Sequence, residues 1–135
     1  NDVFRAVTLI AHLNREDPPS YGSPNPFVSV EGDLLDLHLC MNDRSIVYVW
    51  RDNCLPCEKM RNELENIFNQ STAELGLFAV YGPDWGAHLQ KRYNVVGGPT
   101  ILVMLGDRVD SRVQGAQYRS VIDREIEKLK ASSKK

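Results

Sequence analysis

The 135-residue chain lacks the features that mark several large classes of protein. No apolar run approaches the roughly 18 residues that a membrane span needs, so we expect a soluble chain with no membrane span. Its 16 lysines and arginines nearly balance 18 aspartates and glutamates, with no long block of one sign, so the charge gives no reason to expect a nucleic acid partner. Three cysteines are too few for a disulfide scaffold, and there is no second C-x-x-C pair.

The composition fits one globular domain. With 42% hydrophobic and 25% charged residues, the chain is long enough to bury a core without disulfide staples. It does not begin with methionine, so we expect that trimming or removal of a targeting segment has shortened it. The sequence leaves the cellular compartment undecided between the cytoplasm, which we favour, and an exported or periplasmic location.

Residues 1–26 differ in character from the rest of the chain. Residues 2–14, DVFRAVTLIAHLN, carry apolar side chains at helical spacing, which predicts a short amphipathic helix. The stretch that follows, to residue 26, contains four prolines and a glycine and is predicted to form an ordered loop or arm. We therefore divide the chain into an N-terminal extension, residues 1–26, and a main domain, residues 27–135.

In the main domain, segments with the hydrophobic pattern of a strand alternate with segments that have the pattern of a helix. Apolar runs and period-2 patterns predict strands at 27–30, 45–50, 77–80, 100–105 and 108–114. Helical spacing predicts helices within 31–42, 54–68, 84–93 and 118–130, with Asp84 as the cap of the third. This order predicts an α/β sandwich built on a mixed sheet.

The sequence CLPC, residues 54–57, lies where a buried strand ends and a helix begins. Pro56 suits the first turn of that helix, because its missing N–H has no partner there in any case. The free N–H groups and the positive end of the helix dipole stabilise a thiolate at this place. We expect Cys54 to be exposed and to attack a disulfide, and Cys57 to be covered and to resolve the mixed disulfide.

Two other interpretations of the cysteine pair stay open. A zinc site needs four ligands, and the other candidate ligands are scattered over different predicted elements: His12, His38, Cys40 and His88. In the second interpretation the two cysteines are inert packing residues. We favour the redox dithiol, and we expect Cys40 to be a small buried hydrophobe.

These motifs together resemble the thioredoxin superfamily over about residues 27–130. CLPC stands in the place of the active-site motif of that family, and GGPT, residues 97–100, in the place of its proline loop. The resemblance implies a thioredoxin fold, in which a central mixed sheet is flanked by helices. It also implies that Pro99 is cis and that Gly98 offers backbone hydrogen bonds to a substrate peptide.

The resemblance further implies a thiol:disulfide oxidoreductase that acts on protein substrates and needs no bound cofactor. Electrons would then come from a donor such as a thioredoxin reductase or a thiol pool. An alternative is a binding module or assembly subunit that has the fold and little or no turnover. The implied site consists of the catalytic Cys54 and Cys57 and of the substrate-facing residues Asn53, Leu55, Pro56, Gly98 and Pro99.

The chain departs from the family pattern at four positions. Asn53 and Leu55 replace a tryptophan and a glycine of the usual motif, which alters the surface that faces the substrate. Tyr48 aligns with a buried aspartate that is thought to help deprotonate the second cysteine, and Val80 with its lysine partner. Tyrosine is a poor base at neutral pH, although its hydroxyl can hold a water, so we expect slower resolution and longer-lived mixed disulfides. Trp50 is expected to pack beneath the site.

Overall fold

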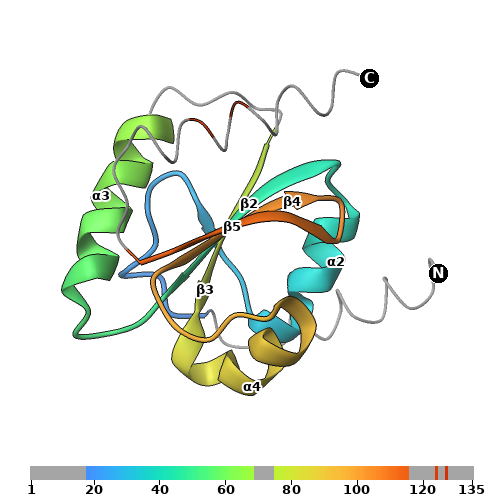
Figure 1. Ribbon diagram of the computed structural model, residues 1–135. Coiled ribbons are helices and arrows are strands. Elements are labelled where there is room, and N and C mark those ends of the chain that lie inside the picture. Colours follow the sequence, from blue (N-terminus) through green and yellow to red (C-terminus); the bar gives the residue numbers. More distant parts are fainter. Residues whose placement is uncertain (1–17, 69–74, 116–123, 125–126, 128–135) are drawn as a thin grey trace.

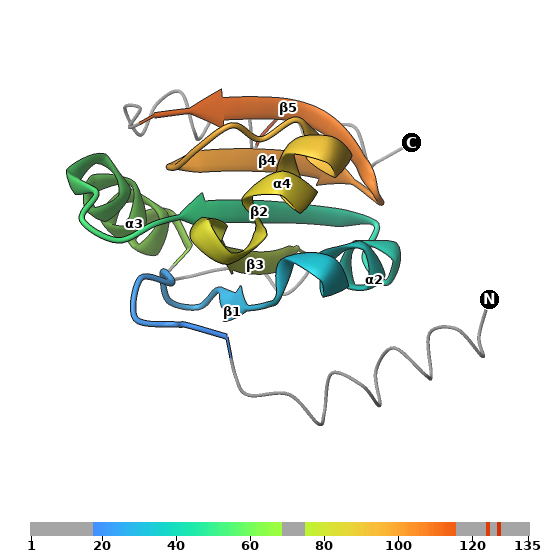
Figure 2. The same cartoon turned by 90° about the horizontal axis from the view of Figure 1, so that it is seen from below.

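The computed structural model describes residues 18–68, 75–115, 124 and 127. A five-stranded sheet runs through its centre. Its strands lie in the order β1-β3-β2-β4-β5, which Figure 2 shows from β1 at one edge of the sheet to β5 at the other. The strands are β1 (Val28–Ser29), β2 (Arg44–Trp50), β3 (Gly76–Tyr81), β4 (Thr100–Leu105) and β5 (Arg108–Gln114). β1, β3 and β2 are parallel, whereas β4 and β5 run antiparallel to their neighbours. The sheet is therefore mixed, as predicted.

Helices cover both faces of this sheet, so the described part of the chain has three layers (Figure 1). They are the short 3-10 helix η1 (Gly32–Leu34), α2 (Leu35–Cys40), α3 (Leu55–Phe68) and α4 (Gly82–Tyr93). α3 lies on one face, and α2 and α4 lie on the other. None of the helices in the described ranges is long and apolar enough to cross a bilayer.

The side chains of β2 show how the sequence produces these layers. Ile46, Tyr48 and Trp50 point to the core under α3, whereas Val47 and Val49 point to the core under α2 and α4. Successive side chains of a strand face opposite sides, and a strand covered on both faces needs apolar residues at every position. β2 is thus the central strand that its sequence predicted, and its last residue leads directly to the cysteine pair.

The predicted strands and the helices at 31–42, 54–68 and 84–93 are all present, with shifts at their ends. The prediction of Asp84 as a helix cap is wrong, because α4 already begins at Gly82 after the extended residue Tyr81. Pro83 lies in the first turn, where its fixed φ favours a helix start before Asp84. The helix predicted over 2–14 lies outside the described residues, as does the one over 118–130 apart from residues 124 and 127.

The burial predicted for Cys40 is also wrong, because this residue is exposed. It is the last residue of α2, whose inward side chains are Leu35, Leu37 and Leu39. The chain turns away directly after it, and the next residue, Met41, is 60% exposed. Cys40 therefore lies on the outer side of the helix end, far along β2 from the CLPC pair.

Candidate functional site: a cysteine pair where β2 meets α3

Cys54 and Cys57 form a disulfide at the start of α3. Their Cα atoms are 5.2 Å apart, a separation that the helical turn between them sets. β2 ends at Trp50, four residues before Cys54, and α3 begins at Leu55. The strand and the helix thus hold the pair at one end of the central strand.

The backbone of the first helical turn faces the sulfur of Cys54. The Cys57 N–H donates a hydrogen bond to Cys54 Sγ over 3.1 Å, and the Glu58 N–H donates to the Cys54 carbonyl over 3.1 Å. A donor aimed at a sulfur stabilises its charged form, as the dipole at a helix N-terminus does. When the pair is reduced, this geometry favours a thiolate at Cys54.

Both cysteines are buried, with 4% of each exposed. This confirms the expectation for Cys57 and contradicts the one for Cys54, which the sequence placed at an open helix end. The reason is tertiary packing: Cys54 belongs to the core cluster under α3, together with Trp50 and Met60. Residues before β1 add to this cover, since Tyr21 lines the same cavity as the two sulfurs.

The proline loop, residues 97–100, lies against Cys57 of the disulfide. The Gly98–Pro99 peptide bond is cis, as the resemblance implied, and Pro99 is buried. A Cβ built on Gly98 would lie 3.6 Å from Cys57 Sγ and 3.3 Å from the carbonyl oxygen of Val49. The backbone of Gly98 therefore approaches both the sulfur and the end of β2, which leaves little room for a side chain there.

The other three residues of the implied site surround the pair at the surface. Asn53, Leu55 and Pro56 are exposed, and 62% of Leu55 is accessible. Asn53 has a φ of 50°, in the left-handed region that asparagine adopts more readily than most residues. This conformation gives a local reason for asparagine at the position where the family motif has tryptophan.

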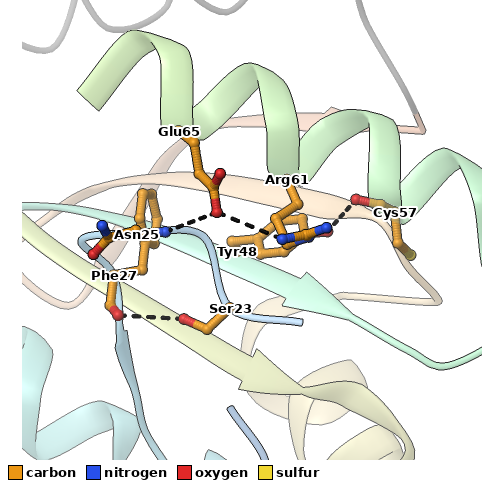
Figure 3. A network of polar contacts seen from close by, with 7 residues as sticks. All are labelled: Ser23, Asn25, Phe27, Tyr48, Cys57, Arg61 and Glu65. Carbon is orange, nitrogen blue, oxygen red and sulfur yellow. Dashed lines mark hydrogen bonds and ion pairs between the residues drawn. The ribbon is translucent and has the colours of Figure 1, made fainter. Parts of the chain in front are cut away.

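Tyr48, which the resemblance aligns with a buried aspartate, is itself fully buried beneath the first turn of α3. Its hydroxyl donates a hydrogen bond of 2.7 Å to the carbonyl oxygen of Cys57, as Figure 3 shows. Burial raises the pKa of the Tyr48 phenol well above its ordinary value, although the Arg61 guanidinium opposes the shift. Tyr48 is therefore a hydrogen-bond donor to the backbone of Cys57 and not a base. The alignment of Val80 with the lysine partner is wrong, because Val80 lies in the core on the other face of the sheet. The residue that pairs with Tyr48 across β2 and β3 is Ala79.

Sequence reasoning missed a second group of residues, centred on Asp52. The hydroxyls of Tyr21 and Tyr81 each donate a hydrogen bond to one of its carboxylate oxygens. These bonds lower the pKa of Asp52, and the carboxylate in turn raises the pKa of both tyrosines. We call these three residues the Asp52 clamp. It joins the segment before β1 to the loop that carries the cysteine pair.

The clamp surrounds the ring of Trp50, which is buried beneath the site as expected. The centroid of the Trp50 ring lies 5.0 Å from that of Tyr21 and 4.8 Å from that of Tyr81. Gly22 lies so close to the Trp50 ring that a Cβ there would overlap it. The sequence motif SYGSPNP predicted an arm, but no local pattern shows that a tyrosine 31 residues away bonds to Asp52.

Residues 18–26, which we call the arm, also contact α3 (Figure 3). The Asn25 N–H donates to Glu65 Oε1 over 3.2 Å, and Glu65 lies 3.6 Å from Arg61 in an ion pair. Directly after the arm, the ring of Phe27 meets that of Phe68 edge to face at 5.6 Å. The arm is thus anchored to the loop before the cysteines and to the helix after them.

Two cavities lie on either side of Trp50 and Arg51. The first, of about 130 Å³, touches both cysteines and is bounded by Tyr21 and Gly22 of the arm. The second, of about 290 Å³, is mostly apolar and runs along α4, from Gly82 to Gln90, beside the segment 95–98. The surface around the disulfide therefore offers a small polar hollow on the arm side and an apolar groove on the proline-loop side.

The described residues give no support to the zinc interpretation. No group of three or more histidine, cysteine, aspartate or glutamate side chains within the described ranges could hold a metal ion. His12 lies outside those ranges. Cys54 and Cys57 are bonded to each other, and Cys40 lies at the other end of β2.

Fold and site together define a thioredoxin-like protein with a dithiol–disulfide pair at the start of a helix. A comparison with family models matches the thioredoxin model to residues 30–128, so the chain belongs to the thioredoxin family. Membership and the cysteine pair support thiol–disulfide redox chemistry in general. No curated protein sequence matches the chain.

Solved structures of thioredoxins share this fold. A mutant thioredoxin from Halobacterium salinarum NRC-1 superposes with a TM-score of 0.65 at 21% identity, over 86% of this chain and 96% of that one. The short form of thioredoxin f from spinach chloroplasts also gives 0.65, at 16% identity, over 76% and 91% of the two chains. These comparisons bear out the fold that the sequence predicted.

Tyr48→Phe tests the hydrogen bond beneath the cysteine pair. The substitution keeps the buried ring and removes only the donor to the Cys57 carbonyl. We therefore expect the free energy of unfolding, measured by urea titration, to fall by about 1 to 2 kcal/mol. Tyr93→Phe is the matched control, since its buried hydroxyl has no hydrogen-bond partner among the described residues. An equal or larger loss in the control would contradict the role given to Tyr48.

The Asp52 clamp predicts a particular dependence of stability on pH. Because the folded-state pKa of Asp52 is lowered, its contribution is complete above the ordinary value of 3.8 and is lost as pH falls through the folded value. The raised pKa values of Tyr21 and Tyr81 keep their contribution complete below 10.0. We therefore expect Asp52→Asn to be less stable than the native chain by a constant amount between about pH 5 and pH 9, and by less in acid.

Urea titrations of both proteins at a series of pH values measure this difference. The clamp would be contradicted if the difference in unfolding free energy between the native chain and Asp52→Asn grew as the pH fell below about 4. Protonation of Asp52 would then cost the native chain no stability.

Proposed function

We propose that this chain is a thiol:disulfide oxidoreductase that exchanges disulfides with protein substrates through Cys54 and Cys57. The observation that carries the proposal is the hydrogen bond from the Cys57 N–H to Cys54 Sγ at the start of α3. It gives the two sulfurs different environments, because a backbone donor faces Cys54 and stabilises its thiolate. Family membership supports the same chemistry.

The reaction proceeds in two exchanges. The Cys54 thiolate attacks one sulfur of a substrate disulfide, so that a mixed disulfide forms and the other substrate sulfur leaves as a thiolate. Cys57, once deprotonated, attacks Cys54 Sγ, which releases the second substrate thiolate and forms the Cys54–Cys57 bond. Two electrons pass to the substrate, and a reductase or a thiol pool must return them to the chain. No bound cofactor enters these steps.

The surface residues around the pair would position the substrate. We propose that Gly98 offers its backbone to an extended substrate segment and that Pro99 holds this backbone beside Cys57. Asn53, Leu55 and Pro56 would contact the segment from the side of α3. The exposure of these three residues and the short approach of Gly98 to the sulfur support this arrangement.

The second candidate function is a binding module or assembly subunit with little turnover. The presence of Tyr48 where a buried carboxylate is usual favours it, because this tyrosine gives its proton to a hydrogen bond and cannot accept the one from Cys57. Cys57 would then resolve mixed disulfides slowly, so that the complex with the partner protein would persist. The two functions differ in turnover and not in fold.

The redox equilibrium of the cysteine pair tests the proposal. We expect a reversible two-electron transition between about −270 mV and about −120 mV when the chain is equilibrated with defined thiol buffers and read by mass after alkylation. A value near the lower end would indicate a reductant, and one above about −180 mV an oxidant or isomerase. Cys57→Ser, which cannot close the disulfide, is the control.

If the native chain formed no internal disulfide at any poise, the oxidoreductase proposal would fail and the binding module would replace it. A normal transition without turnover of protein disulfides would also favour the binding module.

A further inference from the structure

Large apolar side chains are exposed at few places in the described part of the chain, and these places are not evenly spread. Those exposed by more than half are Tyr21, Val28, Met41, Leu55 and Val96. Leu55 follows Cys54 directly, Val96 lines the apolar groove beside the proline loop, and Tyr21 lines the hollow that touches both sulfurs. Three of the five therefore lie on the cysteine motif or line one of the two cavities on either side of Trp50.

Tyr21 differs from the other two because it belongs to the arm and not to the cysteine motif or the proline loop. Its side chain is 69% exposed, yet its position is fixed from several directions. The hydroxyl bonds to Asp52, and the ring meets Trp50 edge to face. Gly22 lies on the same indole ring, and further along the arm Asn25 bonds to α3.

A ring held in this way suits the recognition of a partner. Its polar tip is already satisfied by Asp52, so the surface that it offers to solvent is the apolar ring. Aromatic residues that are fixed before binding lose little conformational entropy in a complex, and tyrosine is frequent among the residues that dominate binding energies. Thiol–disulfide exchange brings a substrate polypeptide to this surface, since the cysteine that is attacked carries its neighbours with it.

We propose that Tyr21 is a substrate-contacting, specificity-determining residue, which extends the recognition surface across the arm side of Cys54. Leu55 and Val96 contact a substrate chain on the motif and groove sides, and Tyr21 contacts it on the third side. The partner that fits is a polypeptide with apolar side chains next to its reacting cysteine. A small disulfide without such neighbours reaches the sulfur and gains nothing from Tyr21. This inference rests on the proposed function.

The test compares two disulfide substrates with the reduced chain. Insulin supplies a disulfide within a polypeptide, and hydroxyethyl disulfide supplies one without neighbours. We expect Tyr21→Ala to lower kcat/KM for insulin about tenfold, mainly through KM, and to change the rate with hydroxyethyl disulfide far less. Tyr21→Phe, which keeps the ring, should lose clearly less.

Met41→Ala is the matched control, because Met41 is similarly exposed and lies beyond the end of α2, away from the disulfide. It should leave both rates unchanged. The redox equilibrium of Tyr21→Ala, measured alongside, gives the part of the change that arises at the sulfurs, and the loss with insulin should exceed that part.

Three results would overturn the proposal. An equal loss with both substrates would show that Tyr21 acts on the geometry of the cysteine pair. A loss as large in Tyr21→Phe as in Tyr21→Ala would assign the effect to the hydroxyl bond with Asp52. A faster reaction with insulin would mean that the arm obstructs substrates. If the native chain reduced neither substrate, the proposed function itself would fail, which is a distinct outcome.

Discussion

The redox site depends on how the first turn of α3 is held against the end of β2. A buried hydrogen bond from Tyr48 to the Cys57 carbonyl fixes this contact from below. Because the same turn directs the Cys57 N–H to Cys54 Sγ, the position of the turn also sets the electrostatic environment of Cys54. Displacing it would change the burial and the charge preference of both sulfurs together. A buried polar pair that is fully satisfied gives such a site rigidity without a buried charge.

The same bond means that Tyr48 does not accept the proton of Cys57. The phenol of Tyr48 keeps its own proton, since burial raises its pKa, so a proton acceptor must reach Cys57 from elsewhere. The hollow on the arm side borders Cys57, Glu58 and Asp52, and its volume of about 130 Å³ is sufficient for a few water molecules. Asp52 is a weak acceptor because two tyrosine hydroxyls already stabilise its charged form. A structural hydrogen bond thus stands where the resemblance implies a buried base.

Much of this arrangement could be predicted from sequence, because the signals are local. The apolar run in β2 and the helical spacing after Cys57 predicted the elements, and the resemblance predicted a mixed sheet flanked by helices and the cis Gly98–Pro99 bond. The order of the strands in the sheet was not predicted. The exposure of Cys54 and the burial of Cys40 were predicted wrongly, because both depend on what other segments place beside them. Side-chain burial at a helix end is decided by tertiary packing, which periodicity does not report.

The Asp52 clamp is the clearest example of what sequence could not show. Its members come from the arm, from the loop after β2 and from the end of β3, and no spacing rule connects a tyrosine at 21 with an aspartate at 52. Only the folded chain shows that the arm reaches the cysteine pair. What the sequence did provide was the composition of the arm, whose prolines restrict the backbone and lower the entropy lost when it docks.

The division of roles between the two cysteines, with attack by Cys54 and resolution by Cys57, is the basis of the proposed function. Trapping measures it most directly: reduced Cys57→Ser and reduced Cys54→Ser are each mixed with a protein disulfide at neutral pH, and the adducts are identified by mass. We expect rapid accumulation of a mixed disulfide on Cys54 in the first variant and little or no adduct in the second. Faster adduct formation on Cys57 in Cys54→Ser would overturn these roles, because the helix N-terminus would then activate Cys57 instead of Cys54.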